Sequence, residues 1–120
     1  MGRILIVEDD ESVRTFTARA LQSAGHTVET AEDGAEGMEK ISAAAGTYDL
    51  VLSDIRMPVM DGIEMAREAA RAFPSMRILL MTGYAEQRER AAELEGVVVG
   101  VVNKPFTLPQ IRDQVSRAMR

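Results

Sequence analysis

The sequence contains no cysteine, no tryptophan and a single histidine, and aromatic residues make up only 4% of its 120 positions. Without cysteine the chain can form neither disulfide bonds nor thiolate metal sites, and His26 alone cannot build a histidine-rich zinc site. The scarcity of aromatic side chains disfavours sites that hold flavins or nucleobases by stacking. We expect His26 to be an exposed turn residue beside Gly25, with no catalytic part.

Long apolar runs and an excess of positive charge are missing as well. No apolar segment approaches the roughly 18 residues that a membrane span requires, and no signal-peptide pattern opens the chain. We therefore expect a cytoplasmic protein without a membrane partner. The formal net charge of -5 argues against direct binding of nucleic acid, which needs clustered lysine and arginine.

The remaining composition is that of an ordinary globular protein, with 46% hydrophobic and 28% charged residues. A length of 120 residues suits one domain, and the sequence shows no linker, internal repeat or low-complexity segment. We therefore expect residues 1–120 to form a single domain.

Short apolar or β-branched runs alternate with amphipathic segments along the whole chain. The runs predict five strands, at residues 3–7, 27–31, 49–53, 77–81 and 100–102. Apolar residues at helical spacing predict a helix after each strand. Strands that alternate with helices form a parallel sheet covered on both faces, so the expected fold is α/β, a doubly wound (βα)5 domain.

The predicted helices differ in how many apolar anchors they carry. The first packs through residues such as Val13 and Phe16 and is expected to end at Gly25. The fourth, spanning 85–95, offers only three apolar residues, namely Ala91, Ala92 and Leu94. A helix with so few buried side chains is expected to shift at low cost.

Chemically unusual residues follow four of the predicted strands. They are Glu8-Asp9-Asp10 after the first, Ser53-Asp54 after the third, Thr82-Gly83 after the fourth and Asn103-Lys104-Pro105 after the fifth. In an open parallel sheet, the loops at these strand ends form the ligand crevice. If the first and third strands are neighbours, the carboxylates of Asp9 and Asp54 lie within a few ångströms of each other and repel unless a cation intervenes.

Oxygen ligands with open positions suit Mg²⁺, which prefers carboxylates together with phosphate. Lys104 is then interpreted as a positive charge directed at an anion, and Thr82 as a hydroxyl that donates a hydrogen bond to the same anion. Carboxylates, a metal ion, a lysine and a hydroxyl around one point predict phosphoryl chemistry at an aspartate.

Four segments together resemble the receiver (CheY-like) domains of two-component response regulators. They are ILIVEDDES (4–12), DLVLSDIRMPVMDG (49–62), ILLMTGYAE (78–86) and VVNKPF (101–106). The resemblance covers essentially the whole chain, and the four motifs in this order and spacing are highly specific. It implies a flavodoxin-like fold, a five-stranded parallel sheet with strand order 2-1-3-4-5.

The resemblance also implies roles for individual residues. Asp54 corresponds to the phosphate-accepting nucleophile, and Asp9 to a direct ligand of Mg²⁺. Glu8 is expected to act on the metal through a water molecule, and the backbone carbonyl of Arg56 to complete the protein's share of the metal shell. Asp10 falls one place past the family's acid pair, and helix N-terminal charge is the better interpretation of its position.

At the other two strand ends, the family pattern assigns Thr82 and Lys104 to the oxygens of the phosphoryl group. The small Gly83 that follows supports this interpretation of Thr82, which would otherwise be expected to cap a helix. The bond between Lys104 and Pro105 is expected to be cis, which fixes the direction of the lysine.

The sequence departs from the family at Val101, three residues before the lysine, where many receivers carry tyrosine or phenylalanine. We hypothesise that Tyr84, two residues after Thr82, takes the place of that aromatic residue in reporting phosphorylation. Arg56, two residues after Asp54, is expected to influence the lifetime of the phosphoryl group.

The function implied is a phosphorylation-dependent signalling switch and not an enzyme with a separate substrate. A histidine kinase or a histidine phosphotransfer protein would donate the phosphoryl group. A downstream protein target would bind the face formed by the fourth helix, fifth strand and fifth helix. The chain resembles both stand-alone, CpdR-like receivers and receivers of hybrid kinases, and an excised receiver of a larger regulator is a further alternative.

Two other functions are compatible with parts of the pattern. A small phosphatase of the haloacid-dehalogenase type also uses an aspartate nucleophile, but it needs an acid two residues later, where this chain has Arg56. A flavodoxin-like FMN protein shares the fold, but the three acids after the first strand would repel its phosphate.

Overall fold

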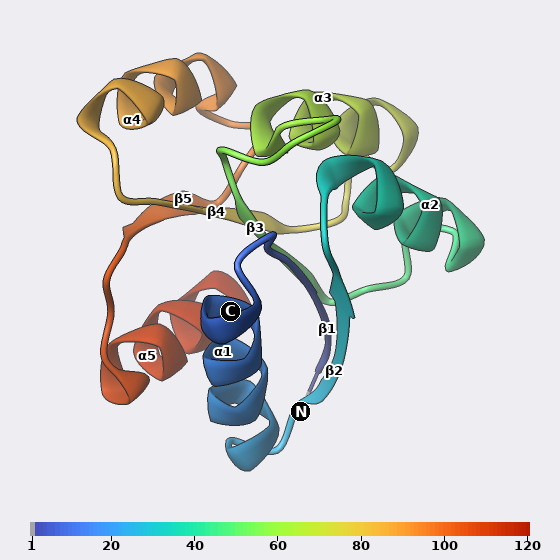
Figure 1. Ribbon diagram of the computed structural model, residues 1–120. Coiled ribbons are helices and arrows are strands. Elements are labelled where there is room, and N and C mark those ends of the chain that lie inside the picture. The colour runs from blue at the N-terminus through green and yellow to red at the C-terminus, as the bar shows by residue number, and fades with distance from the viewer. Residues whose placement is uncertain (1) are drawn as a thin grey trace.

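The computed structural model describes residues 2–120 and contains one five-stranded parallel sheet between two layers of helices (Figure 1). The strands are β1 (Arg3–Val7), β2 (Thr27–Ala31), β3 (Leu50–Asp54), β4 (Ile78–Thr82) and β5 (Gly100–Asn103). Their order in the sheet is β2-β1-β3-β4-β5, which confirms the predicted order and the α/β doubly wound fold.

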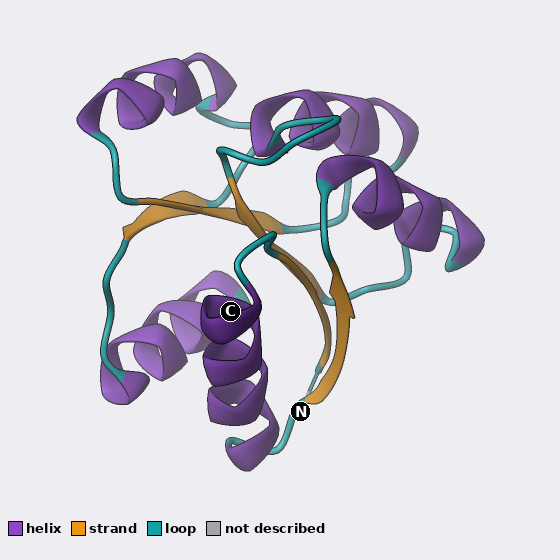
Figure 2. Ribbon diagram, viewed as in Figure 1, coloured by secondary structure: helices purple, strands orange, loops and turns teal. Residues whose placement is uncertain are grey.

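The helices divide unequally between the two faces of the sheet, as Figures 1 and 2 show. They are α1 (Glu11–Ser23), α2 (Gly34–Ala43), α3 (Gly62–Ala72), α4 (Ala85–Ala91) and α5 (Leu108–Ala118), and the short 3-10 helix η1 (Ala92–Leu94) continues α4. Helices α1 and α5 cover one face, and α2, α3 and α4 cover the other. In the part of the chain described, no helix is both long enough and apolar enough to cross a membrane.

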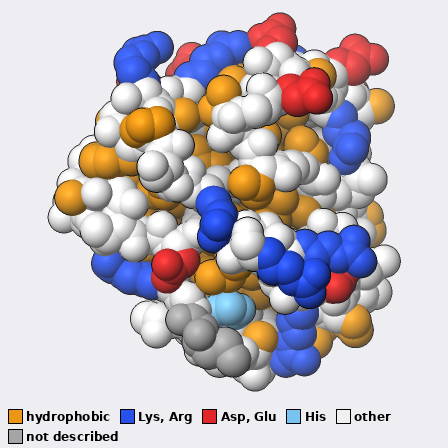
Figure 3. Space-filling model, turned by 180° about the vertical axis from the view of Figure 1, so that it is seen from behind, with side chains coloured by type: hydrophobic (Ala, Val, Ile, Leu, Met, Phe, Trp, Pro, Cys, Tyr) orange, Lys and Arg blue, Asp and Glu red, His pale blue; other side chains and the backbone are white. Residues whose placement is uncertain are grey.

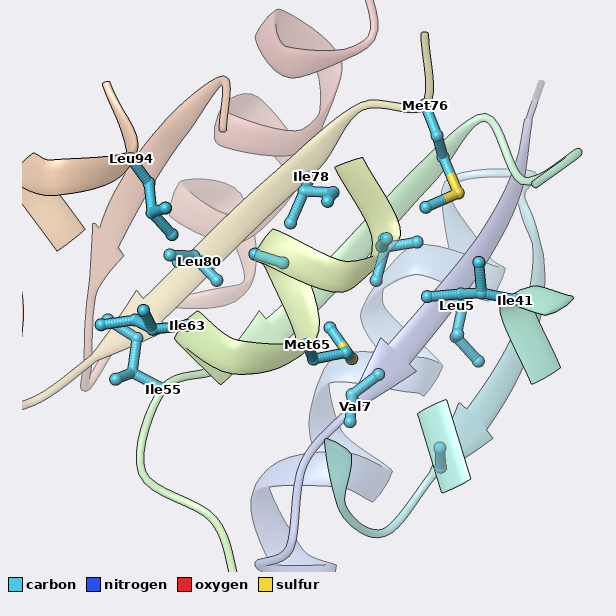
Figure 4. Packing of buried hydrophobic residues seen from close by; sticks show 14 of the residues in the cluster. Leu5, Val7, Ile41, Ile55, Ile63, Met65, Met76, Ile78, Leu80 and Leu94 are labelled. Carbon is cyan, nitrogen blue, oxygen red and sulfur yellow. The ribbon is translucent and has the colours of Figure 1, made fainter. Parts of the chain in front are cut away.

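Each face of the sheet has its own apolar core because neighbouring residues of a strand point to opposite faces. In β1, Ile4 and Ile6 face α1 and α5, whereas Leu5 and Val7 face α2 and α3. Figure 4 shows the second core, where Val7 lies close to Met65 of α3. All five residues of β3 and of β4 are buried, as expected for the central strands of a parallel sheet.

The strand predictions were correct within one residue at each end. Strands β1 and β2 have the predicted bounds, whereas β3 and β4 begin and end one residue later than predicted and β5 extends to Asn103. The shift matters for the site because Asp54 and Thr82 are the last residues of their strands. Backbone pairing of Asp54 with Met81 and of Thr82 with Asn103 fixes both polar residues in the sheet.

The fourth helix was predicted incorrectly in one respect. The α-helical part ends at Ala91, and the chain tightens into η1. Three residues per turn then place Ala91 and Leu94 on the same side, where both are buried, and leave Ala92 exposed. Ala92 is therefore not an anchor of this helix.

Two further expectations need correction. Phe16 is not a core residue: its side chain is 42% exposed, because it lies at the rim of α1 against the ring of Phe106, 6.3 Å away between centroids. His26 is half-buried, because its Nδ1 accepts a hydrogen bond of 3.1 Å from the Gly2 backbone at the start of the sheet.

Candidate functional site

Three carboxylates meet at the carboxyl ends of β1 and β3. Ligand oxygens of Glu8, Asp9 and Asp54 lie within 4.8 Å of one another, as the sequence predicted for Asp9 and Asp54. The pairing of Val7 with Ser53 brings the two strand ends together. Glu8 and Asp54 are buried, whereas Asp9 is exposed at the mouth of the site.

Lys104 reaches the acids from the end of β5. Its Nζ lies 3.0 Å from Oε1 of Glu8 and 3.2 Å from Oδ1 of Asp54. The backbone of the lysine is held by a 2.8 Å hydrogen bond from its N–H to the Thr82 carbonyl, and the bond to Pro105 is cis, as expected. The lysine is thus the cation that faces both buried carboxylates.

The electrostatics of the site show an excess of buried negative charge. Burial and the neighbouring charge of Asp54 raise the pKa of Glu8 to about 7, although Lys104 opposes this shift. Burial also raises the pKa of Asp54, against the opposing effect of Lys104. Burial lowers the pKa of Lys104, but the two carboxylates outweigh it and raise that pKa overall.

One buried oxygen of the site has no partner. Oε2 of Glu8 makes no hydrogen bond within the described chain, which is costly for a buried carboxylate. A cation among the three carboxylates would satisfy it, and an oxygen-only donor set suits Mg²⁺. The residues present therefore fit a magnesium ion.

Thr82 is buried at the end of β4, one residue past Met81, which pairs with Asp54. Its Oγ1 accepts a 3.1 Å hydrogen bond from the Tyr84 N–H and lies 3.4 Å from the Tyr84 carbonyl. Gly83 also lines the site, but a Cβ there would come no closer than 3.6 Å to the Lys104 carbonyl oxygen. Packing therefore does not require glycine at this position.

Arg56 and Tyr84 form the exposed rim of the same cavity. The guanidinium carbon of Arg56 lies 5.1 Å from the centre of the Tyr84 ring, within the range of a cation–π interaction. Val101 is half-buried and packs against the core on the α4 side of the sheet. The aromatic residue near Thr82 is therefore Tyr84, and its ring contacts Arg56.

Asp10 has a structural role. It is the N-cap of α1, and its Oδ1 accepts a 3.0 Å hydrogen bond from the Val13 N–H. The capping hydrogen bond agrees with the interpretation that Asp10 serves as a charge at the N-terminus of a helix. Sequence reasoning missed Arg14, whose side chain donates a 2.9 Å hydrogen bond to the Glu8 carbonyl and so steadies the acid pair.

The loop between β3 and α3 fixes the main chain around Asp54. The Gly62 N–H donates a 2.8 Å hydrogen bond to the Ile55 carbonyl, and a Cβ at Gly62 would lie only 2.1 Å from the Asp54 carbonyl oxygen. Only glycine permits this approach. Asp61 begins α3 as its N-cap and accepts a 2.9 Å hydrogen bond from the Glu64 N–H.

Comparison with known proteins agrees with this arrangement. The sequence model of the family described as "Response regulator receiver domain" matches residues 4–116. The response regulator receiver protein CpdR of Brucella abortus is 34% identical over 119 residues, which cover 99% of this chain and 98% of CpdR. The sensor kinase CckA of the same organism is 36% identical over 116 residues, which cover 97% of this chain but only 12% of CckA.

A solved structure of similar fold contains a metal ion and a phosphoryl mimic. The response regulator TrrA of Thermotoga maritima, in complex with Mg²⁺ and beryllofluoride, superposes with a TM-score of 0.88 at 32% sequence identity. The superposition covers 98% of this chain and 99% of TrrA.

Proposed function

This chain belongs to the response regulator receiver domain family, and we propose that it is a phosphorylation-dependent switch with Asp54 as phosphoacceptor. Receiver domains are signalling proteins rather than classical enzymes. The observation that carries the proposal is the meeting of Asp54, Glu8 and Asp9 with Lys104 at one point, with one carboxylate oxygen left unpaired.

In the proposed reaction, an oxygen of the Asp54 carboxylate attacks the phosphorus of a phosphohistidine. The bond between phosphorus and the imidazole nitrogen breaks, and the imidazole leaves with the electron pair. Lys104 and the Thr82 hydroxyl hold oxygens of the transferring group and offset its charge. Water later attacks the phosphorus of the acyl phosphate, the bond to the Asp54 oxygen breaks, and inorganic phosphate leaves while the carboxylate is restored.

A bound Mg²⁺ would supply further charge neutralisation at the phosphoryl oxygens. We assign Asp9, Asp54 and the Arg56 carbonyl as its ligands from the protein, with Glu8 acting through water. The fit rests on the carboxylate cluster and on the unpaired Oε2 of Glu8.

We propose that a histidine kinase or a histidine phosphotransfer protein donates the phosphoryl group. An apolar groove beside the site supports a docking position for that donor. Its lining residues are Ser12, Val13, Phe16, Lys104, Pro105 and Phe106. Because Lys104 lines both this groove and the acidic cavity, a donor in the groove would present its imidazole near Asp54.

For the output we propose a protein target that binds the face formed by α4, β5 and α5. The small buried surface of α4 and η1 supports a change on this face, since Ala91 and Leu94 are their buried residues. We also propose that residues 1–120 are one receiver domain. Similarity to both CpdR and CckA leaves a stand-alone receiver and part of a hybrid kinase as alternatives.

A phosphatase of the haloacid-dehalogenase type is less well supported. Its leaving group needs an acid two residues after the nucleophile. That position holds Arg56, whose guanidinium is always charged and lies against Tyr84.

The test is the intact mass of the protein after incubation with Mg²⁺ and acetyl phosphate. We expect one added phosphoryl group in the wild type, no addition in Asp54→Ala, and no addition after chelation of the metal. Glu89→Ala, an exposed substitution on α4, is the control and should be modified like the wild type. If no added mass is found, beryllofluoride binding distinguishes a phosphoryl group that is lost too quickly from a site that accepts none. A wild-type protein that does not bind beryllofluoride would contradict the proposal.

A further inference from the structure

Helix α4 and η1 bury few side chains and contact α3 through charged ones. Among their described residues, only Ala91 and Leu94 are buried. Figure 4 shows Leu94 reaching toward Leu80 of β4. Charged side chains of both signs crowd the edge of the molecule where α3 and α4 lie (Figure 3). Polar contacts with α3 therefore add to the small apolar burial that positions this segment.

Two ion pairs connect the segment to α3. Arg90 of α4 contacts Oδ2 of Asp61 at 2.8 Å, and Glu93 of η1 contacts Arg67 of α3 at 2.6 Å. Both oxygens of Asp61 are engaged, because Oδ2 meets Arg90 while Oδ1 caps α3. Burial alone would raise the pKa of Asp61, but the hydrogen bonds from the Glu64 backbone and from Arg90 lower it overall.

The other end of α4 contacts the candidate site directly. Tyr84 is the N-cap residue of α4, and its backbone bonds to Thr82 Oγ1 while its ring lies under Arg56. If the Thr82 hydroxyl turns to a phosphoryl oxygen on Asp54, its contacts with Tyr84 must change. The start of α4 would then move, and the ion pairs farther along the helix would resist that movement.

The α3 partners of these ion pairs cannot follow such a movement. Asp61 immediately precedes Gly62, which is in close contact with the Asp54 carbonyl, and α3 is anchored by buried side chains such as Ile63 and Met65. A shift of α4 must therefore stretch or break its contacts with α3.

In the conformation described, Lys104 pairs with Asp54, and the Thr82 hydroxyl lies against the backbone of Tyr84 at the start of α4. We propose that the pairs Asp61–Arg90 and Arg67–Glu93 form a latch that holds α4 in this conformation and thereby lowers the affinity of Asp54 for a phosphoryl group or its mimic. The α3–α4 latch rests on the proposed function and deepens it by naming a regulator of the same site.

The size of the expected effect follows from the exposure of the pairs. Exposed ion pairs contribute little individually, so loss of one should shift the conformational equilibrium by about two- to five-fold. A ligand that binds the shifted conformation gains affinity by the same factor, because it no longer has to break the latch.

The test is the dissociation constant of beryllofluoride with Mg²⁺, measured by NMR titration of the whole chain. Arg90→Gln and Glu93→Gln should each bind about two- to five-fold more tightly than the wild type, and the double variant more tightly still. Asp61→Asn should behave like Arg90→Gln, because asparagine also caps a helix but lacks the charge. Arg117→Gln removes an exposed ion pair within α5 and should leave the affinity unchanged.

A reversed pair, Arg67→Glu with Glu93→Arg, should restore the wild-type affinity, which a general loss of stability would not do. In the same samples, amide exchange at Ala91 and Leu94 should be faster in the single variants and return to normal in the reversed pair. Unchanged or weaker beryllofluoride affinity in the single variants would overturn the latch alone. Absence of binding in the wild type would overturn the proposed function, and the latch with it.

Discussion

Helices α3 and α4 lie on the same face of the sheet, but different interactions hold them there. Helix α3 buries five residues, namely Gly62, Ile63, Met65, Ala66 and Ala69. Helix α4 with η1 buries Ala91 and Leu94 and relies on arginine contacts with α3 and β5. Apolar burial stabilises more than exposed ion pairs do, so α3 is the fixed neighbour and α4 the adjustable one.

The difference matches the places where the two helices meet the site. The N-terminus of α3 touches the main chain of Asp54 and must keep it in place. The N-terminus of α4 touches Thr82 through Tyr84, at the position where a response to phosphorylation would begin. The rigid helix therefore begins at the main chain of Asp54, and the adjustable helix begins next to Thr82.

The largest effect that tests this comparison is expected from a truncation within α3. Ile63→Ala removes a side chain that is 1% exposed and should lower the free energy of unfolding by about 2–5 kcal/mol. Glu89→Ala, on the exposed face of α4, should change it by no more than about 0.5 kcal/mol. Urea unfolding measures both, and equal losses would contradict the contrast between the helices.

A smaller effect is expected from adding a methyl group at the start of α3. The Cβ of Gly62→Ala would lie 2.1 Å from the Asp54 carbonyl oxygen, so the main chain must shift, at a cost of about 1–3 kcal/mol. Gly83→Ala, whose Cβ would meet nothing closer than 3.6 Å, is the matched control and should cost far less. Urea unfolding compares the two, and similar costs would show that the loop does not fix Asp54.

The smallest effect is expected at low pH, where α4 should lose amide protection when Asp61 becomes protonated. Because the pKa of Asp61 is lower in the folded protein than in the unfolded chain, its contribution to stability is complete above its unfolded pKa of about 4. That contribution is lost as the pH falls through the lower, folded value. Below about pH 4, amide protection at Ala91 should therefore decrease before protection at Met65 of α3.

Hydrogen exchange, corrected for intrinsic rates, measures this difference in protection. The variant Asp61→Asn has no charge to lose at this position, so its Ala91 amide should already exchange faster at neutral pH. Identical pH profiles for Ala91 in the variant and in the wild type would contradict a role for Asp61 in holding α4.

The sequence was informative where local pattern and strand order were enough. Apolar runs located every strand, and the acids after β1 and β3 predicted the carboxylate cluster, since adjacent strands must bring their ends together. The contacts of Arg14 with Glu8 and of Arg90 with Asp61 were not predicted. Long arginine side chains can reach many acceptors, so their partners depend on tertiary packing and leave no local signal.

The same reason explains the errors at Phe16 and Ala92. Each residue fits the helical spacing of a buried position, but neighbouring packing decides its exposure. Phe16 has only the rim residue Phe106 to pack against, and the tightening into η1 turns Ala92 outward. The spacing of apolar residues along a helix predicts neither the lack of packing partners at Phe16 nor the change of helix type at Ala92.

The bond between Lys104 and Glu8 joins residues that are 96 positions apart in the chain. Closing so long a loop carries a large entropic cost, which is recovered only when the intervening strands have taken their places. The contact between Lys104 and Glu8 therefore depends on the order of the whole sheet, because β1, β3, β4 and β5 all lie between or beside the two residues. A chain without β5 has the acids of β1 and β3 but not the lysine that faces them, so the first and the fifth strand must lie in one sheet before the charges of the candidate site can balance.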